Sequence, residues 1–378
     1  MDFEGRLNIR LHARGGRVEG VEIRSSRPVH ASRVFVGKGV EAALSLLPLL
    51  FSVCGTAQAC AGVRACEQAL GHSPGPETER LREALVGLET LQQHLWHLML
   101  RWPAFLGEAP LEEAMIGARR LLDARRRQLS PDEGPFRPGR EVGKIRGGEP
   151  AAGEALVRLL AETVFGEPPE AWLERVALAE LEAWVAGRRT VAARLLDQVM
   201  ARNWQGVGRS PVPHLPLLHE AQLRPAFRED AFVERPRWQG MCRETSALTR
   251  TRSPLLQRLH DTLGNGLLTR LVARLTEVAR LALEPPALAP LPADGAGEGT
   301  GIGRAEAARG RLFHRVELDG ERILDYRILA PTEWNFHPRG VVASSLSGIA
   351  GTAAEMERQA RLVVDAIDPC VGYDLEIC

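Results

Sequence analysis

The feature of this chain that most restricts its fold is the placement of its cysteines near the two ends. Cys54, Cys60 and Cys66 follow one another in the amino-terminal part, and Cys370 and Cys378 both lie within the last nine residues. Thiolates bind soft metal ions, and a thiol on a short terminal tail can move to meet a metal. Because more than three hundred residues separate the two clusters, a site that uses both must be closed by the whole fold.

Length and charge limit the class of protein. The chain has 378 residues, 44% of them hydrophobic, which is enough for a sizeable core in one large domain over residues 1–378. Its 48 basic and 48 acidic side chains give a formal net charge of zero, so neither nucleic acid nor an acidic membrane surface is favoured as a partner.

Targeting and redox signals predict a cytoplasmic protein. The first residues lack a basic start followed by an apolar core, and the longest apolar run, about residues 42–53, is too short to span a bilayer. Six unevenly clustered cysteines in a chain of this length fit metal or thiol chemistry in a reducing compartment better than a disulfide framework.

The apolar pattern predicts an α+β fold that is predominantly helical, with two small β-hairpins. Alternation on both sides of Gly15-Gly16 predicts a hairpin over about residues 7–23, and the runs around Asp319-Gly320 predict another over residues 311–329. Loops are predicted at about 130–150 and 284–303, which are rich in Pro, Gly, Ala or charge. Helical spacing covers about residues 40–70, 78–102, 111–128, 151–165, 169–200, a pair within 253–283, and 345–367, which stops at Asp368-Pro369.

Six motifs along the chain resemble the large subunits of nickel-iron hydrogenases, in the same order and over nearly the whole length. The resemblance implies the large-subunit fold, mostly helical with small β elements. His94 and His97 resemble part of the His-rich helix of that family and are expected to be packed core histidines. The motifs are Phe3-Glu4-Gly5-Arg6-Leu7, Cys54-Gly55, Glu234-Arg235-Pro236-Arg237-Trp238-Gln239-Gly240, Arg309-Gly310-Arg311-Leu312-Phe313-His314, Ala330-Pro331-Thr332-Glu333-Trp334-Asn335 and Asp368-Pro369-Cys370.

The chain departs from that family at the metal ligands. Catalytic large subunits carry Cys-x-x-Cys twice, and the four thiolates hold nickel and iron. Here Ala57 and Tyr373 stand where the second cysteine of each motif would be. The resemblance therefore implies that an ordinary nickel-iron centre cannot form. Cys60 and Cys378 could compensate, but from other positions.

This combination resembles the hydrogenase maturation proteins called HupK and HoxV. The resemblance implies a non-catalytic scaffold that transiently carries iron with its cyanide and carbonyl ligands, without nickel. Its expected partners are the maturation proteins that deliver this unit and the precursor of the hydrogenase large subunit. A carrier must later release its cargo, and two or three thiolates suit this task better than four thiolates do.

The same resemblance implies roles for individual residues. Cys54, Cys370, Cys60 and Cys378 are the candidate iron ligands. Arg309 and the hydroxyl of the Pro331-Thr332 pair are expected to donate hydrogen bonds to the cyanides, and Leu312 is expected to line the carbonyl pocket. Guanidinium and hydroxyl donors suit anionic acceptors in a dry cavity.

Structural alternatives stand beside these assignments. Free cysteine is commonly a small buried hydrophobe, and Cys60 and Cys66 lie about 240° apart on a continuous helix, so one of them is expected in the core. Arg309 could form a structural ion pair instead of binding cyanide. Glu244 is expected to be a buried carboxylate with a basic partner.

Two other classes of function remain open beside the scaffold. An active hydrogenase subunit would need four thiolates at the metals, and the two incomplete motifs argue against it. A metal-free structural relative would be expected to have lost the terminal cysteines, which are present. We therefore expect an assembly scaffold and not an enzyme.

Overall fold

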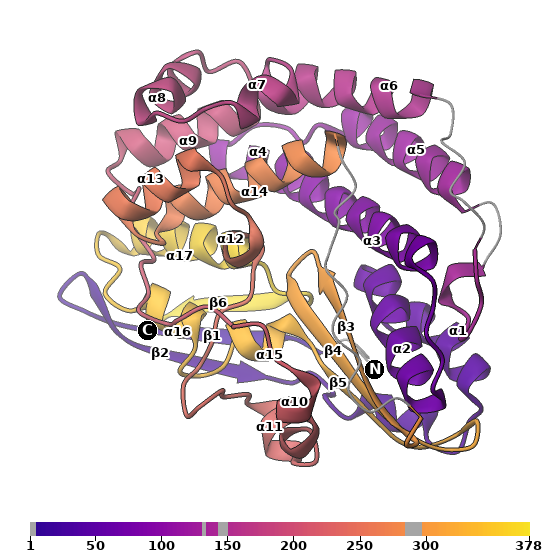
Figure 1. Ribbon diagram of the computed structural model, residues 1–378. Coiled ribbons are helices and arrows are strands. Elements are labelled where there is room, and N and C mark those ends of the chain that lie inside the picture. Colours follow the sequence, from indigo (N-terminus) through magenta and orange to yellow (C-terminus); the bar gives the residue numbers. More distant parts are fainter. Residues whose placement is uncertain (1–4, 131–133, 143–149, 284–296) are drawn as a thin grey trace.

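The computed structural model describes residues 5–130, 134–142, 150–283 and 297–378. Within these ranges most residues lie in helices, and six strands form two three-stranded sheets. Figure 1 shows a layer of helices on one side of the molecule and both sheets on the other. The Phe3-Glu4 part of the first motif and much of both predicted loops lie outside the described residues.

The first sheet joins the two ends of the chain. Strands β1 (Leu7–Arg14) and β2 (Arg17–Ser25) form the predicted hairpin, and β6 (Tyr373–Ile377) pairs with β1 in parallel. The N–H of Cys378 still donates to the Leu11 carbonyl, at 2.9 Å. The prediction of a mobile terminal tail was therefore wrong, because the sheet fixes it (Figure 1).

The second sheet contains the other predicted hairpin and one strand that was not expected. β4 (Gly310–Asp319) and β5 (Arg322–Leu329) confirm the hairpin, and β3 (Thr300–Ala307) begins inside the second predicted loop. β3 packs closely on α2 (Gly55–Leu70): a Cβ at Gly303 would come within 2.0 Å of a carbonyl oxygen of α2. Small residues replace the large apolar ones that usually mark a strand.

The helices follow the predicted pattern with some breaks. The predicted helix over 169–200 is three helices, and the last long helix begins at Ala353 and stops at Ile367, the latter as predicted. The bounds are η1 (Ala31–Phe35), α1 (Val40–Leu50), η2 (Ser52–Cys54), α3 (Pro76–Trp96), η3 (His97–Arg101), α4 (Trp102–Leu106), α5 (Glu112–Leu129), η4 (Gly134–Phe136), α6 (Pro150–Leu160), η5 (Ala161–Phe165), α7 (Pro169–Leu173), α8 (Leu178–Ala186), α9 (Val191–Ala201), α10 (Glu220–Ala226), α11 (Asp230–Glu234), α12 (Ala247–Arg250), α13 (Pro254–Leu263), α14 (Leu267–Leu283), α15 (Pro331–Asn335), α16 (Val341–Leu346) and α17 (Ala353–Ile367).

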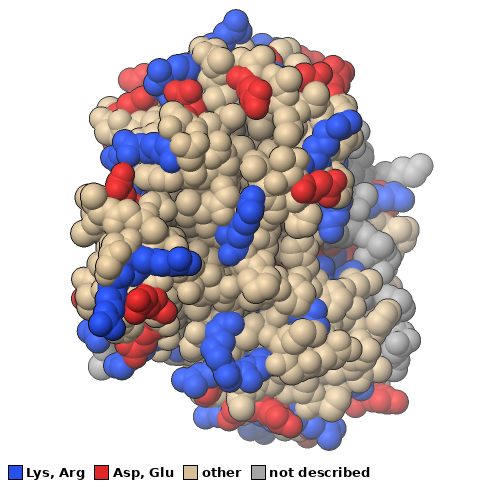
Figure 2. Space-filling model, turned by 90° about the vertical axis from the view of Figure 1, so that its left-hand side faces the viewer, with Lys and Arg blue, Asp and Glu red and all other residues tan. Residues whose placement is uncertain are grey.

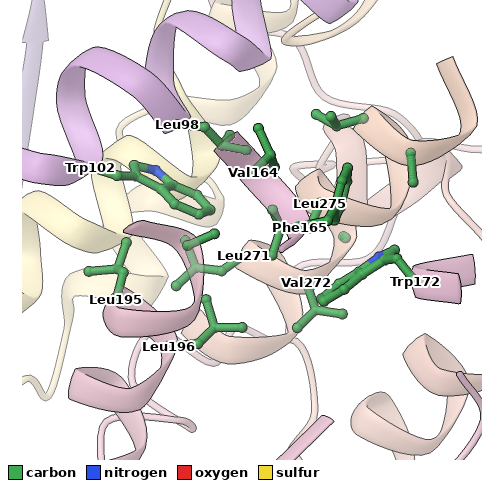
Figure 3. Packing of buried hydrophobic residues seen from close by; sticks show 14 of the residues in the cluster. Leu98, Trp102, Val164, Phe165, Trp172, Leu195, Leu196, Leu271, Val272 and Leu275 are labelled. Atoms are coloured by element: carbon green, nitrogen blue, oxygen red, sulfur yellow. The ribbon is translucent and has the colours of Figure 1, made fainter. Parts of the chain in front are cut away.

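The largest hydrophobic core lies within the helical layer. Figure 3 shows side chains from η3, α4, η5, α7, α9 and α14 pointing toward one another, with Trp102 and Trp172 among the largest fully buried ones. Buried aromatic and aliphatic groups of this size supply much of the free energy of folding. This core fixes α3 and α14, which carry polar side chains toward the candidate site described below.

The described surface and helices bear on which partners the protein can have. On the face shown in Figure 2, basic and acidic side chains are interspersed. Among the described residues no single helix is long and apolar enough to cross a membrane. Only α1 taken together with residues 52–70, across a bend of 97°, meets those criteria.

Candidate metal centre

A small pocket lies where the α1–α2 junction, the start of β4 and the segment before β6 meet. Its volume is about 70 Å³, and both Cys54 and Cys370 line it, together with Arg309, Leu312 and Pro331. Pockets for organic ligands of drug size usually have roughly 300–1,000 Å³. The size of this pocket therefore suits a small inorganic group.

Cys54 owes its position to a sharp change of helix direction. α1 ends at Leu50, and Cys54 is the residue that precedes α2, with non-helical backbone angles. Burial, together with nearby Cys370 and Glu89, raises the pKa of the Cys54 thiol to about 12. The thiol is thus protonated at neutral pH, and a metal cation that binds it would have to displace that proton.

Glu89 of α3 is a buried carboxylate beside this pocket that the sequence reasoning missed. Its oxygens accept hydrogen bonds from the N–H groups of Thr56 and Ala57, at 2.7 and 3.0 Å. These are among the free N–H groups at the start of α2, so Glu89 caps the helix that follows Cys54. Burial raises the pKa of Glu89. No motif marks this residue, because its partners are backbone groups of a distant segment.

Cys370 is held by the hydroxyl of Thr332 at the start of α15. Thr332 Oγ1 donates to Cys370 Sγ at 3.1 Å and accepts from the Cys370 N–H at 3.3 Å. Thr332 does not line the pocket, although the neighbouring Pro331 does. In this structure the Thr332 hydroxyl therefore faces the Cys370 sulfur, not the place where a cyanide was expected.

Arg309 is a buried cation with two sets of partners. Its Nε donates to the Pro369 carbonyl at 3.1 Å and lies 3.3 Å from Asp368 Oδ1. Each terminal nitrogen donates one hydrogen bond to Gln93 Oε1, at 3.3 Å. A guanidinium has five N–H groups, so the second N–H of each terminal nitrogen has no partner within the described residues. Arg309 also lines the pocket, so its positive charge lies beside any anion bound there.

Arg27 places a second cation at the pocket, and the sequence reasoning did not find it. It follows β2, lines the pocket and forms an ion pair with the buried carboxylate of Glu333. Burial opposes its charge, but Cys370, Glu333 and Cys54 together hold its pKa above the ordinary value. Two arginines therefore face the two thiols. No pattern around Arg27 distinguishes it from the exposed arginines of the hairpin.

The structure does not bring Cys60 or Cys378 to this pocket. Cys60 is fully buried in a hydrophobic cluster on α2, as is Cys66, so both occupy the core and not only one of them. Cys378 is exposed beyond the far end of β6. In the described ranges no group of three or more His, Cys, Asp or Glu side chains is arranged to hold a metal ion. The expected four-cysteine set is thus reduced to Cys54 and Cys370 here.

The expected structural roles of three other residues are confirmed. His94 Nε2 lies 2.7 Å from Glu277 Oε2, and His97 lies between Asp365 and Asp368, with both histidines buried. Glu244 is fully buried and paired with Arg270, which lowers its pKa against the opposing effect of burial.

A chain of buried polar groups runs from Cys54 into the interior. Gln58 Nε2 donates to Cys54 Sγ at 3.4 Å, and Gln58 Oε1 lies 2.8 Å from His314 Nε2. His314 Nδ1 lies 2.8 Å from the hydroxyl of Tyr326. Burial lowers the pKa of His314 to about 3. His314 is therefore uncharged in the folded protein at neutral pH.

This buried histidine predicts a loss of stability on mild acidification. The unfolded chain protonates His314 near pH 6.5, whereas the folded protein does so only near its pKa of about 3. Between these values the unfolded state binds more protons, so the free energy of unfolding falls as pH falls, by about 1.4 kcal/mol per pH unit. Urea unfolding at several pH values below about 6.5 measures the slope. His314→Gln should make the slope shallower, and an unchanged slope in that variant would contradict the assignment.

Sequence comparison finds close relatives over the whole length. The chain is 32% identical to the hydrogenase expression/formation protein HupK of Azotobacter vinelandii, with 99% of this chain and 98% of the relative covered. It is also 32% identical to the hydrogenase expression/formation protein HoxV of Cupriavidus necator, with 98% and 96% covered. Residues 236–372 match the family described as nickel-dependent hydrogenase.

Solved structures with a similar fold include hydrogenases. The Ni-Fe-Se hydrogenase of Desulfovibrio vulgaris Hildenborough in the reduced state has a TM-score of 0.63 at 17% identity, covering 95% of this chain and 94% of that one. The [NiFeSe]-hydrogenase of Desulfomicrobium baculatum has a TM-score of 0.62 at 15% identity, with 95% of each chain covered. At these identities the likeness establishes the fold alone, and it confirms the predicted large-subunit-like fold.

Proposed function

Because the chain belongs to the HupK and HoxV family of hydrogenase expression/formation proteins, we propose that it is an assembly scaffold for nickel-iron hydrogenase. Its cargo is an iron atom with two cyanide ligands and one carbonyl ligand, which it receives from delivery proteins. It then passes this unit to the precursor of the hydrogenase large subunit.

The observation that carries the proposal is the meeting of Cys54 and Cys370 in one small pocket. The two residues come from segments more than three hundred residues apart, and the sheet that joins the chain ends fixes the Cys370 segment. Thiolates are good ligands for iron. Two of them leave coordination positions for cyanide and carbonyl.

The charges and apolar groups around the thiols support this cargo. Bound iron with two thiolates and two cyanides carries net negative charge, and Arg309 and Arg27 face it with positive charge. The free N–H groups of Arg309 are suitable donors to a cyanide nitrogen. Leu312 supplies an apolar wall that suits the neutral carbonyl. Thr332 supports Cys370 through its sulfur, which differs from the direct cyanide contact expected from the sequence.

The number of thiols favours a carrier over a catalyst. Within the described residues the pocket contains two cysteines, whereas the two Cys-x-x-Cys motifs of catalytic large subunits supply four thiolates. A carrier must also release its cargo. Each iron–sulfur bond that breaks would be replaced by a bond to a thiolate of the acceptor, so the exchange needs no oxidant or reductant.

Infrared spectroscopy with metal analysis tests the proposal. The full-length protein would be purified without oxygen from a host that makes the cyanide-delivery machinery. We expect one carbonyl band and two cyanide bands, together with iron and no nickel. Iron with stoichiometric nickel would favour a catalytic site instead. Absence of these bands and of iron in every preparation would favour a metal-free interaction module and would overturn the proposal.

A further inference from the structure

The hydrogen bonds that link Tyr326, His314 and Gln58 to Cys54 can all be donated toward the sulfur or all away from it. The buried hydroxyl of Tyr326 decides between these two directions. An uncharged imidazole has one N–H donor and one acceptor nitrogen. In one direction Tyr326 donates to His314 Nδ1, His314 Nε2 donates to the Gln58 carbonyl oxygen, and the Gln58 amide donates to the sulfur. In the opposite direction the amide is turned round, and every hydrogen bond of the chain is reversed.

The reversed direction leaves a buried donor without an acceptor. Tyr326 is 1% exposed, and within the described residues its hydroxyl has no hydrogen-bonding partner other than His314. If His314 donated to this hydroxyl, the phenolic O–H would point into an apolar core, which is costly. The chain therefore has one favourable direction, in which every proton is donated toward Cys54.

A sulfur at the end of such a chain is an acceptor before any cargo arrives. Gln58, His314 and Tyr326 are all at least 98% buried, so water does not compete for their hydrogen bonds. Hydrogen bonds to a metal-bound sulfur withdraw electron density from it and so tune the metal. Cys370 Sγ also accepts one hydrogen bond, from the hydroxyl of Thr332 at 3.1 Å, but Thr332 does not belong to this chain of groups.

Resting on the proposed function, we infer that Gln58 is a positioning residue that weakens electron donation from Cys54 to the bound iron. His314 and Tyr326 fix the orientation of the Gln58 amide, so that its N–H and not its oxygen faces the sulfur. The interaction makes Cys54 a weaker electron donor to iron than it would be without Gln58, which favours release of the cargo.

The direction of the chain can be tested on the protein without cargo. Nitrogen-15 NMR of the His314 side chain, assigned by the loss of its signals in His314→Gln, distinguishes a protonated Nε2 from a protonated Nδ1. We expect the proton on Nε2. A proton on Nδ1 would overturn the inference whether or not the protein carries iron.

The effect on iron is tested by infrared spectroscopy of the loaded protein. Gln58→Met keeps a side chain of similar length and removes the donor. We expect its carbonyl band to shift to lower wavenumber, because a more electron-rich iron gives more electron density back to the carbonyl. Tyr326→Phe should shift the band in the same direction by a smaller amount. Gln359→Met is the control, because Gln359 is a buried amide that donates to the Ala350 carbonyl, outside this chain of groups.

Release gives a second readout. Transfer of iron to an excess of a competing thiol should be slower in Gln58→Met than in the wild type and unchanged in Gln359→Met. An unshifted carbonyl band in loaded Gln58→Met would overturn the inference while leaving the proposed function intact. A wild-type protein without carbonyl and cyanide bands would overturn the proposed function and the effect on iron together, and the NMR result would still decide the direction of the chain.

Discussion

Replacing Cys370 with serine is expected to abolish the iron content and the infrared bands of the purified protein. The pocket has two thiols within the described residues, Cys54 and Cys370, so each variant that lacks one would leave the iron with a single protein sulfur. Loss of a group that merely supports a metal ligand already weakens binding by roughly 10- to 100-fold. Loss of a ligand itself should exceed the upper end of that range. Cys54→Ser should behave in the same way.

Matched controls are available among the other cysteines. Cys378→Ser changes an exposed thiol beyond β6, and Cys60→Ala changes one in the hydrophobic core of α2. Both variants should retain iron, the second with somewhat lower stability because a buried sulfur is removed. Loss of iron in Cys378→Ser would mean that the tail leaves the sheet to bind the cargo, which would contradict the arrangement described here.

Much of the fold follows from local sequence patterns. The alternation of Leu7, Ile9 and Leu11 reflects a strand with one buried face, and all three side chains are buried. The Asp319-Gly320 turn follows from the left-handed backbone that glycine adopts there, with a φ of 57°. These features depend on neighbouring residues, so they can be predicted from one sequence.

The missed strands depend on partners far away in the sequence. β6 pairs in parallel with β1 at the other end of the chain. The sequence of this five-residue strand does not reveal such a distant partner. β3 contains Gly301 and Gly303 because α2 lies against its backbone. The close packing removes the branched side chains by which a strand is usually identified.

The site divides in a similar way. Cys54, Cys370, Arg309 and Leu312 were found through family motifs, and the structure brings all four to one pocket. Arg27 and the supporting residues Gln58 and Glu89 were not found, because each acts on a segment distant in sequence or on backbone groups. Cys60 lies in the hydrophobic core beside α2 and not at the pocket, which its spacing in the sequence did not decide.

A charge-removal series separates the two possible roles of Arg309, a partner of cyanide or a structural ion pair. Arg309→Met leaves Asp368 buried with His97 Nε2 at 3.1 Å and Arg274 Nη2 at 3.9 Å. Breaking a buried pair from one side costs about 3 kcal/mol or more. Urea unfolding should show this loss, and the variant should also lose its iron and infrared bands.

The double variant Arg309→Met with Asp368→Asn removes both charges of the pair. Asn suits this position because Asp368 has a φ of 67°, a left-handed conformation that asparagine tolerates. Because the buried carboxylate that has lost its Arg309 partner is also removed, the double variant should regain about half of the lost unfolding free energy or more. Iron should remain absent, since the donors to cyanide are still missing. If the double variant recovered both stability and iron, Arg309 would be a structural residue, and recognition of the anionic cargo would then fall to Arg27, the other arginine that lines the pocket.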